Sequence, residues 1–259
     1  MSRARTAGNP DPPRRCRALL THWAGIAALA GVLLWMVFSV SGFAALLRIL
    51  APGEPVVLYP TVSLPQMMLD QLYLVIIASV SALAIGVVLG LLALSRVGRP
   101  FRDVIVNLGN LAQSLPTVAV IMLLVPLIGY GANPVIIGLV LYSILPIVLN
   151  IVAGIEGVQP AARDAAIGIG MSPTQRLIQV ELPLAFPVIL GAIKNMLVIN
   201  ISAATIGAVA AAGGLGQAIL SGFATYNTAF ILEGALPVVV LALLADRLLT
   251  PPGHSVARS

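Results

Sequence analysis

Charged side chains are scarce in this sequence: Asp, Glu, Lys and Arg together make up 9% of the residues, whereas 59% are hydrophobic. Soluble domains carry roughly 25% charged residues, so this chain could not cover a folded surface with charge in water. The few charges are also grouped, and four stretches contain none of them: 18–47, 71–95, 104–155 and 195–232. A helix needs roughly 20 apolar residues to cross a bilayer. The composition therefore predicts an all-α, polytopic membrane protein in contact with lipid.

Cysteine, histidine and lysine are nearly absent as well. The single cysteine, Cys16, excludes an intrachain disulfide framework and a cysteine-based metal site. The only lysine is Lys194, so the glycine-rich run 212–216 lacks the lysine that a phosphate-binding loop requires. We interpret these glycines as a tight extracytoplasmic turn or a close helix contact. No catalytic residue, metal site or cofactor is expected on this chain.

Six membrane-spanning helices account for the apolar runs. Pro116 falls inside the third span, where a proline breaks or kinks a helix. The spans form one transmembrane domain, 20–249, between a basic tail, 1–19, and a short tail, 250–259. The expected spans are 20–42, 71–94, 104–129, 134–153, 185–207 and 229–249.

The arginines predict the orientation of these spans, because positive residues gather in cytoplasmic loops. One side of the bundle carries five arginines in the N-terminal tail, three in 95–103 and two in 154–184. The other side carries only Arg48. With six spans, both termini lie in the cytoplasm. The same asymmetry explains the net charge of +5 without a nucleic-acid partner.

The cytoplasmic segment 156–183 does not resemble a simple loop. Pro160 suits the first position of a helix, and Gly168 and Gly170 are expected to end that helix. The sequence therefore predicts a first short helix followed by a glycine elbow.

A second short helix is expected directly after the elbow. Ser172 and Gln175 have the spacing of a capping box, and Pro183 is expected to stop the helix. Helices this short are marginal alone in water, so the segment needs something to pack against. The alternative from the residues alone is a helix that lies on the bilayer surface.

The 156–183 segment resembles the "EAA" loop of binding-protein-dependent ABC importer permeases. Asp replaces Glu at the first motif position and Val replaces Ile near the end, so the acidic side chain is one methylene shorter. The resemblance implies a coupling helix that inserts into a cleft on separate ATPase subunits. It also implies a second permease subunit, the same or related, an extracytoplasmic substrate-binding protein and a bacterial inner membrane. The matching residues are Asp164, Ala165, Ala166, Gly170, Val180, Leu182 and Pro183.

Two further segments, 204–249 and 114–117, look like the osmoprotectant subgroup of these permeases. That resemblance implies import of glycine betaine, choline, carnitine or proline by alternating access. Amino-acid importers share the Ala-Gly-Gly-Leu-Gly run, so a permease for another small solute is the alternative. An ion-coupled secondary transporter is less favoured, because neither two similar halves nor buried ionisable residues at the midplane are evident.

Polar side chains within the spans are candidates for the translocation pathway, because they are costly against lipid. Each of them has an alternative role as a simple hydrogen bond between neighbouring helices. Glu233, near the outer end of the last span, either lies at the interface or guides a cation. The candidates are Asn110, Gln113, Ser114, Thr117, Asn195, Asn200, Thr205 and Glu233.

Overall fold

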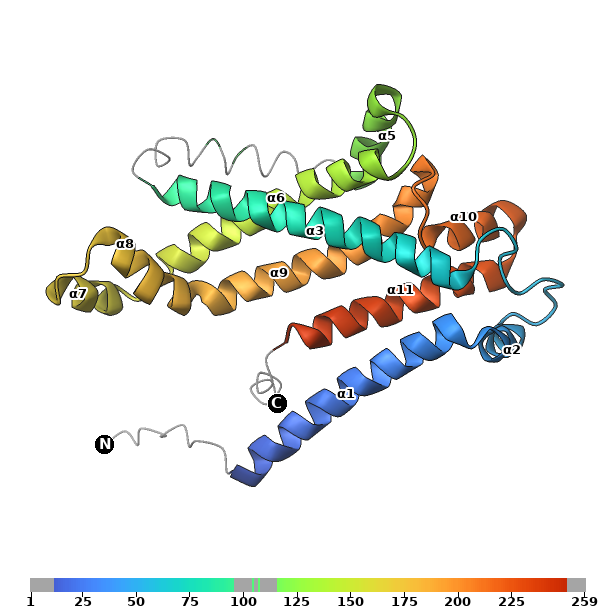
Figure 1. Ribbon diagram of the computed structural model, residues 1–259, viewed down its shortest axis with the longest axis horizontal. Coiled ribbons are helices and arrows are strands. Elements are labelled where there is room, and N and C mark those ends of the chain that lie inside the picture. The colour runs from blue at the N-terminus through green and yellow to red at the C-terminus, as the bar shows by residue number, and fades with distance from the viewer. Residues whose placement is uncertain (1–11, 96–103, 105–106, 108–115, 251–259) are drawn as a thin grey trace, which may run out of the picture.

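The computed structural model describes residues 12–95, 104, 107 and 116–250, with side chains described from residue 19 onward (Figure 1). Every regular element in this part of the chain is helical. The elements are α1 (Pro12–Phe38), α2 (Val40–Leu50), α3 (Leu64–Leu94), α5 (Thr117–Ile128), α6 (Ala132–Glu156), α7 (Pro160–Gly168), α8 (Pro173–Arg176), α9 (Leu182–Ala204), α10 (Gly216–Thr225) and α11 (Thr228–Leu248). A π-helical turn, Leu177–Glu181, joins α8 to α9, and a 3-10 helix, Thr205–Ala210, follows α9.

Five described helices are long and apolar enough to cross a membrane: Leu19–Phe38 within α1, α3, α6, the continuous stretch Pro173–Ala210, and α11. The all-α membrane bundle predicted from the sequence is therefore confirmed. The expected third span, 104–129, lies partly outside the described residues. Its described part, α5, begins directly after Pro116, where a break was expected.

Several predicted boundaries are wrong by a turn or more. The first span was expected to continue to residue 42, but α1 ends at Phe38 and a separate helix, α2, begins at Val40. The second was expected from residue 71, but α3 begins at Leu64 with Pro65 in its first turn. Proline is well suited to that position because it has no N–H to leave unpaired. The apolar runs predicted where each span lies. The exact ends of the helices depend on local residues such as Pro65.

Small residues allow the central helices to approach closely. A Cβ on Gly86 would lie 2.8 Å from the Ile147 side chain, and one on Gly90 would lie 3.0 Å from that of Ile151. These contacts join α3 to α6, and helices in a bilayer commonly pack through such residues because apolar burial alone gives them little attraction. Figure 1 shows α3, α6 and α9 running alongside one another, with α11 and α1 below them.

The two ends of the bundle carry different structures. The short helices α7 and α8 project at one end, and α2 and α10 lie at the other (Figure 1). α1 begins, and α11 ends, toward the end that carries α7 and α8. α3 ends on that side whereas α6 begins on the opposite side, so the chain changes sides between residues 94 and 132. This agrees with an even number of crossings.

Candidate coupling and translocation sites

The first helix of the 156–183 segment starts and ends where the sequence predicts. α7 starts at Pro160 and ends at Gly168. Gly170 then has a φ of +82°, a backbone conformation that favours glycine because it has no Cβ. The helix and its glycine elbow are both confirmed.

The second helix begins with the predicted capping box. The backbone N–H of Gln175 donates to Ser172 Oγ at 3.3 Å, and the backbone N–H of Ser172 donates to Gln175 Oε1 at 2.9 Å. These bonds satisfy two donors that would otherwise lack partners at the start of the helix.

The expected stop at Pro183 is wrong. α8 passes through the π-helical turn Leu177–Glu181 directly into α9, so one helix runs from Pro173 into the membrane span. In that turn, the backbone N–H of Leu182 donates to the carbonyl of Leu177, five residues back. A proline ring normally clashes with the carbonyl four residues before it, which for Pro183 is that of residue 179. Residue 179 lies in the wider π-helical turn, so the regular α-helical geometry that causes the clash is absent there. α8 is thus continuous with a transmembrane helix, whereas α7 is joined to it through the glycine turn. We refer to α7, this turn and α8 together as the elbow.

A cluster of charged side chains, which sequence reasoning missed, holds the elbow together. The Glu181 side chain is only 8% exposed. Its Oε1 lies 3.0 Å from Arg176 Nε and 3.1 Å from Arg163 Nε. Arg163 also donates to the carbonyl of Ile155 in the last turn of α6. The sequence does contain two arginines and a glutamate in this short polar segment, which is compatible with an ion-pair cluster. Only the fold shows that the three side chains meet.

The exposed side of the elbow is apolar at its tip. Of the motif residues, Asp164 and Ala165 are exposed, whereas Ala166 is buried. Ile167 and Ile169 are 55% and 74% exposed, so most of each side chain makes no contact within the protein. The later motif residues have another environment: Val180 and Leu182 are half-buried and Pro183 is exposed.

Asn200 lies in a fully buried polar contact between three spans. Its Nδ2 donates to Ser79 Oγ at 3.0 Å, and its Oδ1 accepts from Ser143 Oγ at 2.9 Å. These residues come from α9, α3 and α6. Sequence reasoning selected Asn200 but not its two serine partners, because hydroxyls are common in membrane helices.

Gln71 makes a second buried link nearer the α10 end. Its Nε2 donates to the carbonyl of Ile201 at 2.8 Å, and its Oε1 accepts from the N–H of Leu215 at 3.3 Å. The adjacent Gly213 and Gly214 have φ values of +85° and +83°. A Cβ on Gly214 would lie 2.7 Å from Gln71 Oε1. The glycine-rich run therefore makes both a tight turn and a close helix contact, as interpreted from the sequence.

The other predicted pathway residues are only partly described. Asn110, Gln113 and Ser114 lie outside the described residues. Thr117 is half-buried at the first position of α5, and Asn195 is exposed on α9. Thr205 Oγ1 donates to the carbonyl of Ser202 in the same helical stretch at 2.6 Å. Of the described candidates in this group, Thr117, Asn195 and Thr205 do not line the pocket beside Glu233.

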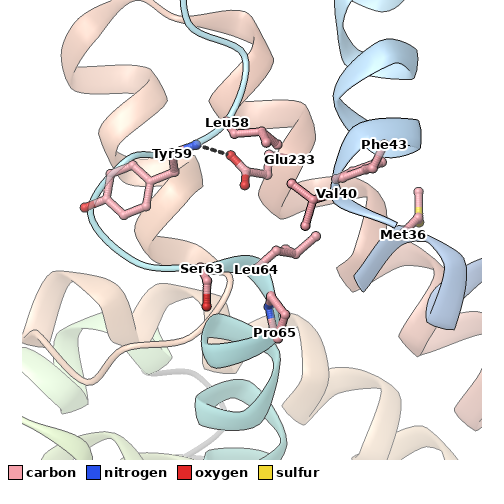
Figure 2. Close-up of a pocket in the computed structure, with 9 residues that line it drawn as sticks. All are labelled: Met36, Val40, Phe43, Leu58, Tyr59, Ser63, Leu64, Pro65 and Glu233. Atoms are coloured by element: carbon pink, nitrogen blue, oxygen red, sulfur yellow. Dashed lines mark hydrogen bonds between the residues drawn. The ribbon is translucent and has the colours of Figure 1, made fainter. Parts of the chain in front are cut away.

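Glu233 lies inside the protein rather than at an interface. It is 1% exposed, and its Oε2 accepts from the backbone N–H of Tyr59 at 2.6 Å (Figure 2). The carboxylate borders a pocket of about 90 Å³ that is otherwise mainly apolar. Figure 2 shows that the lining comes from the α1–α2 junction, the 58–65 segment and α11. The lining residues are Met36, Val40, Phe43, Leu58, Tyr59, Ser63, Leu64, Pro65 and Glu233.

Comparison with known proteins identifies the family of this chain. Residues 82–250 match the binding-protein-dependent transport system inner membrane component. The chain belongs to this family. It is therefore a multi-pass permease of the inner membrane, it catalyses no ATP hydrolysis itself, and it works with an ATPase on a separate chain and with a substrate-binding protein.

Individual relatives cover most of the permease. The chain is 36% identical over 180 residues to the glycine betaine/carnitine/choline transport system permease protein OpuCB of Bacillus subtilis, covering 70% of this chain and 82% of that one. It is 37% identical over 185 residues to the osmoprotectant import permease protein OsmW of Salmonella typhimurium, covering 70% and 85%.

Solved ABC transporters share the fold. One is the MetNI methionine ABC transporter in an inward-facing conformation, with a TM-score of 0.60 and 23% identity over 70% of this chain and 92% of that one. Another is an amino acid ABC transporter solved with histidines, with a TM-score of 0.61 and 22% identity over 70% and 88%.

Proposed function

We propose that this permease carries a small osmoprotectant, such as a quaternary ammonium compound, across the inner membrane by alternating access. The observation that carries the proposal is the similarity to relatives from different bacteria that are permeases for such solutes. OpuCB transports glycine betaine, carnitine and choline, and OpuCD of Listeria monocytogenes, 43% identical over 146 residues, transports carnitine. The permease pairs with a second copy or a related chain, and it needs no cofactor of its own.

The elbow formed by α7 and α8 is the proposed contact with the ATPase. Its tip carries the exposed Asp164, Ala165, Ile167 and Ile169. Large apolar side chains that project into water at the end of a short helix are typical of a protein interface. The elbow and both termini lie on the cytoplasmic side, in agreement with the arginines of the N-terminal tail.

Recognition of a cationic solute is expected to reside mainly in the substrate-binding protein. Aromatic residues make up 5% of this chain, and a cation–π cage needs several of them. Within the permease, the pathway is proposed to use side chains near the break at Pro116, namely Asn110, Gln113, Ser114 and Thr117, and on the α9 stretch, namely Asn195 and Thr205. Asn200 and Glu233 already have hydrogen-bond partners in the described conformation.

The substrate proposal is tested with the complete complex in proteoliposomes. Labelled glycine betaine, choline, carnitine, methionine and histidine are each tested as the transported solute under identical conditions. ATP-dependent accumulation of one of the first three supports the proposal. Accumulation of methionine or histidine alone would assign the chain to the amino-acid importers instead.

Docking is tested with two matched substitutions at opposite ends of the bundle. Ile169→Asp places a charge on the exposed elbow, and Tyr226→Asp places one on a 93% exposed residue at the α10 end. Co-purification of the ATPase should fall for Ile169→Asp and stay normal for Tyr226→Asp, with both proteins still inserted in the membrane. Equal ATPase recovery from both variants would contradict docking at the elbow.

A further inference from the structure

Arg163 makes contacts that no other described residue of the elbow makes. It belongs to α7, yet its guanidinium donates to the carbonyl of Ile155 in α6. Its Nε also lies 3.1 Å from the carboxylate of Glu181, the last residue before α9, in an ion pair without a hydrogen bond from Nε. A single side chain therefore connects the helix that enters the elbow, the helix that projects, and the helix that leaves. We refer to these two contacts as the Arg163 link.

Arg176 approaches the same carboxylate without connecting separate elements. Its Nε donates to Glu181 Oε1 at 3.0 Å, but the two residues are five apart in one continuous helical stretch. The two arginine side chains are almost equally exposed, at 31% for Arg163 and 29% for Arg176. They thus differ in connectivity far more than in charge or environment.

The π-helical turn brings Glu181 to this position. A turn with one additional residue rotates everything after it by about 100° relative to an uninterrupted α-helix. Glu181 is the last residue of the turn, and it is buried between the two arginines. Beneath the charged cluster, Ile155 and Val158 pack with Ala185 and the half-buried Leu177 and Leu182. The base of the elbow is therefore fixed by apolar contacts below and by an ionic cluster above.

We propose that the Arg163 link is a positioning device that turns displacement of α7 into joint movement of the α6 and α9 spans. This inference rests on the proposed docking of α7 to the ATPase. α7 has nine residues and is connected to α8 through a glycine with positive φ, so it would otherwise bend relative to the spans. The guanidinium is suited to this task because its rigid planar fork can donate to the Ile155 carbonyl while another of its nitrogens lies beside the Glu181 carboxylate, whereas a lysine ammonium is a compact point charge.

The test compares Arg163→Gln with Arg176→Gln in the reconstituted complex with its ATPase and binding protein. Transport of the solute and ATP hydrolysis are measured in the same proteoliposomes, and the readout is solute molecules imported per ATP. Arg163→Gln is expected to lower this ratio about three- to tenfold while ATPase association persists. Arg176→Gln is expected to change it less than about twofold.

Further variants exclude simple misfolding. Arg163→Lys keeps the charge and should give an intermediate ratio. Arg163→Gln combined with Glu181→Gln should stay within about twofold of Arg163→Gln alone, because the contact between residues 163 and 181 is already lost and the Arg176–Glu181 contact lies within one helical stretch. Equal ratios for Arg163→Gln and Arg176→Gln would overturn the inference. Equal ATPase recovery from Ile169→Asp and Tyr226→Asp would instead overturn the proposed docking at the elbow, so the two failures are distinct.

Discussion

At the scale of single residues, the buried polar groups within the described spans serve chiefly to hold helices together. Asn200 uses both ends of its amide on Ser79 and Ser143, and Gln71 uses both ends of its own on backbone groups. A polar atom without a partner in an apolar environment costs several kcal/mol. An amide satisfied at both ends therefore favours one arrangement of the helices and is not free to bind a solute.

Replacing Asn200 tests this structural role. Asn200→Ala removes contacts to two other spans and should lower the free energy of unfolding by about 1–2 kcal/mol. Ser202→Ala is the matched control on the same helix, because the Ser202 side chain is exposed and donates to the carbonyl of Val198 within that helix. It should cost less than about 0.5 kcal/mol. Chemical unfolding in detergent measures both, and equal losses would argue against a buried interhelical contact.

Glu233 gives a second prediction at this scale. Glu233→Gln keeps an oxygen that accepts from the Tyr59 N–H, whereas Glu233→Leu does not, so only Glu233→Leu should release the 51–63 segment. Hydrogen exchange at the Tyr59 amide should rise at least about tenfold in Glu233→Leu and little in Glu233→Gln. If a negative charge there guides a cationic solute, Glu233→Gln should also slow uptake. Unchanged uptake would show that the carboxylate only anchors the segment.

At the scale of the elements, the elbow combines local signals with contacts that arise only on folding. Pro160, Ser172 and Gln175 act within one helical turn, so their spacing in the sequence was enough to predict both helix starts. Glu181 meets Arg163 only because α7 folds back onto the base of α9, and sequence spacing contains no such information. The prediction that Pro183 ends the helix was wrong because the π-helical turn before it allows the helix to continue. The sequence alone does not indicate that turn.

The two glycines of the elbow allow a matched test of its shape. Gly170→Ala forces a Cβ into a φ of +82° and should weaken the elbow by about 1–2 kcal/mol. Gly168→Ala meets no atom within 4 Å and lies in a helix, so it should leave stability unchanged or raise it by up to about 1 kcal/mol. Hydrogen exchange of the 160–171 amides reports the difference. A destabilisation of equal size in both variants would contradict the left-handed turn.

At the scale of the whole molecule, the structure separates an end that carries the elbow, the proposed ATPase contact, from an end that carries α2 and α10. The apolar runs predicted the bundle and the arginines predicted its orientation, but the close contact of α3 with α6 and the separate α2 depend on packing that hydropathy does not encode. The elbow lies at one end of the bundle, and α2 and α10 lie at the other (Figure 1).

The orientation can be measured with single cysteines. In a Cys16→Ser background, Tyr226→Cys should react with a membrane-impermeant maleimide in intact cells, because it is 93% exposed at the proposed outer end. Ile169→Cys, 74% exposed on the elbow, should react only after the membrane is opened. The reverse pattern would place the elbow outside the cell and away from any cytoplasmic ATPase.

The central claim is that this bundle moves its solute only when a separate ATPase drives the elbow. The most direct measurement is accumulation of a labelled quaternary ammonium solute by proteoliposomes that contain the permease, its binding protein, and either the active ATPase or one inactivated at its phosphate-binding lysine. We predict ATP-dependent accumulation with the active ATPase and none above the ATP-free level with the inactive one. Equal accumulation with both would contradict the account.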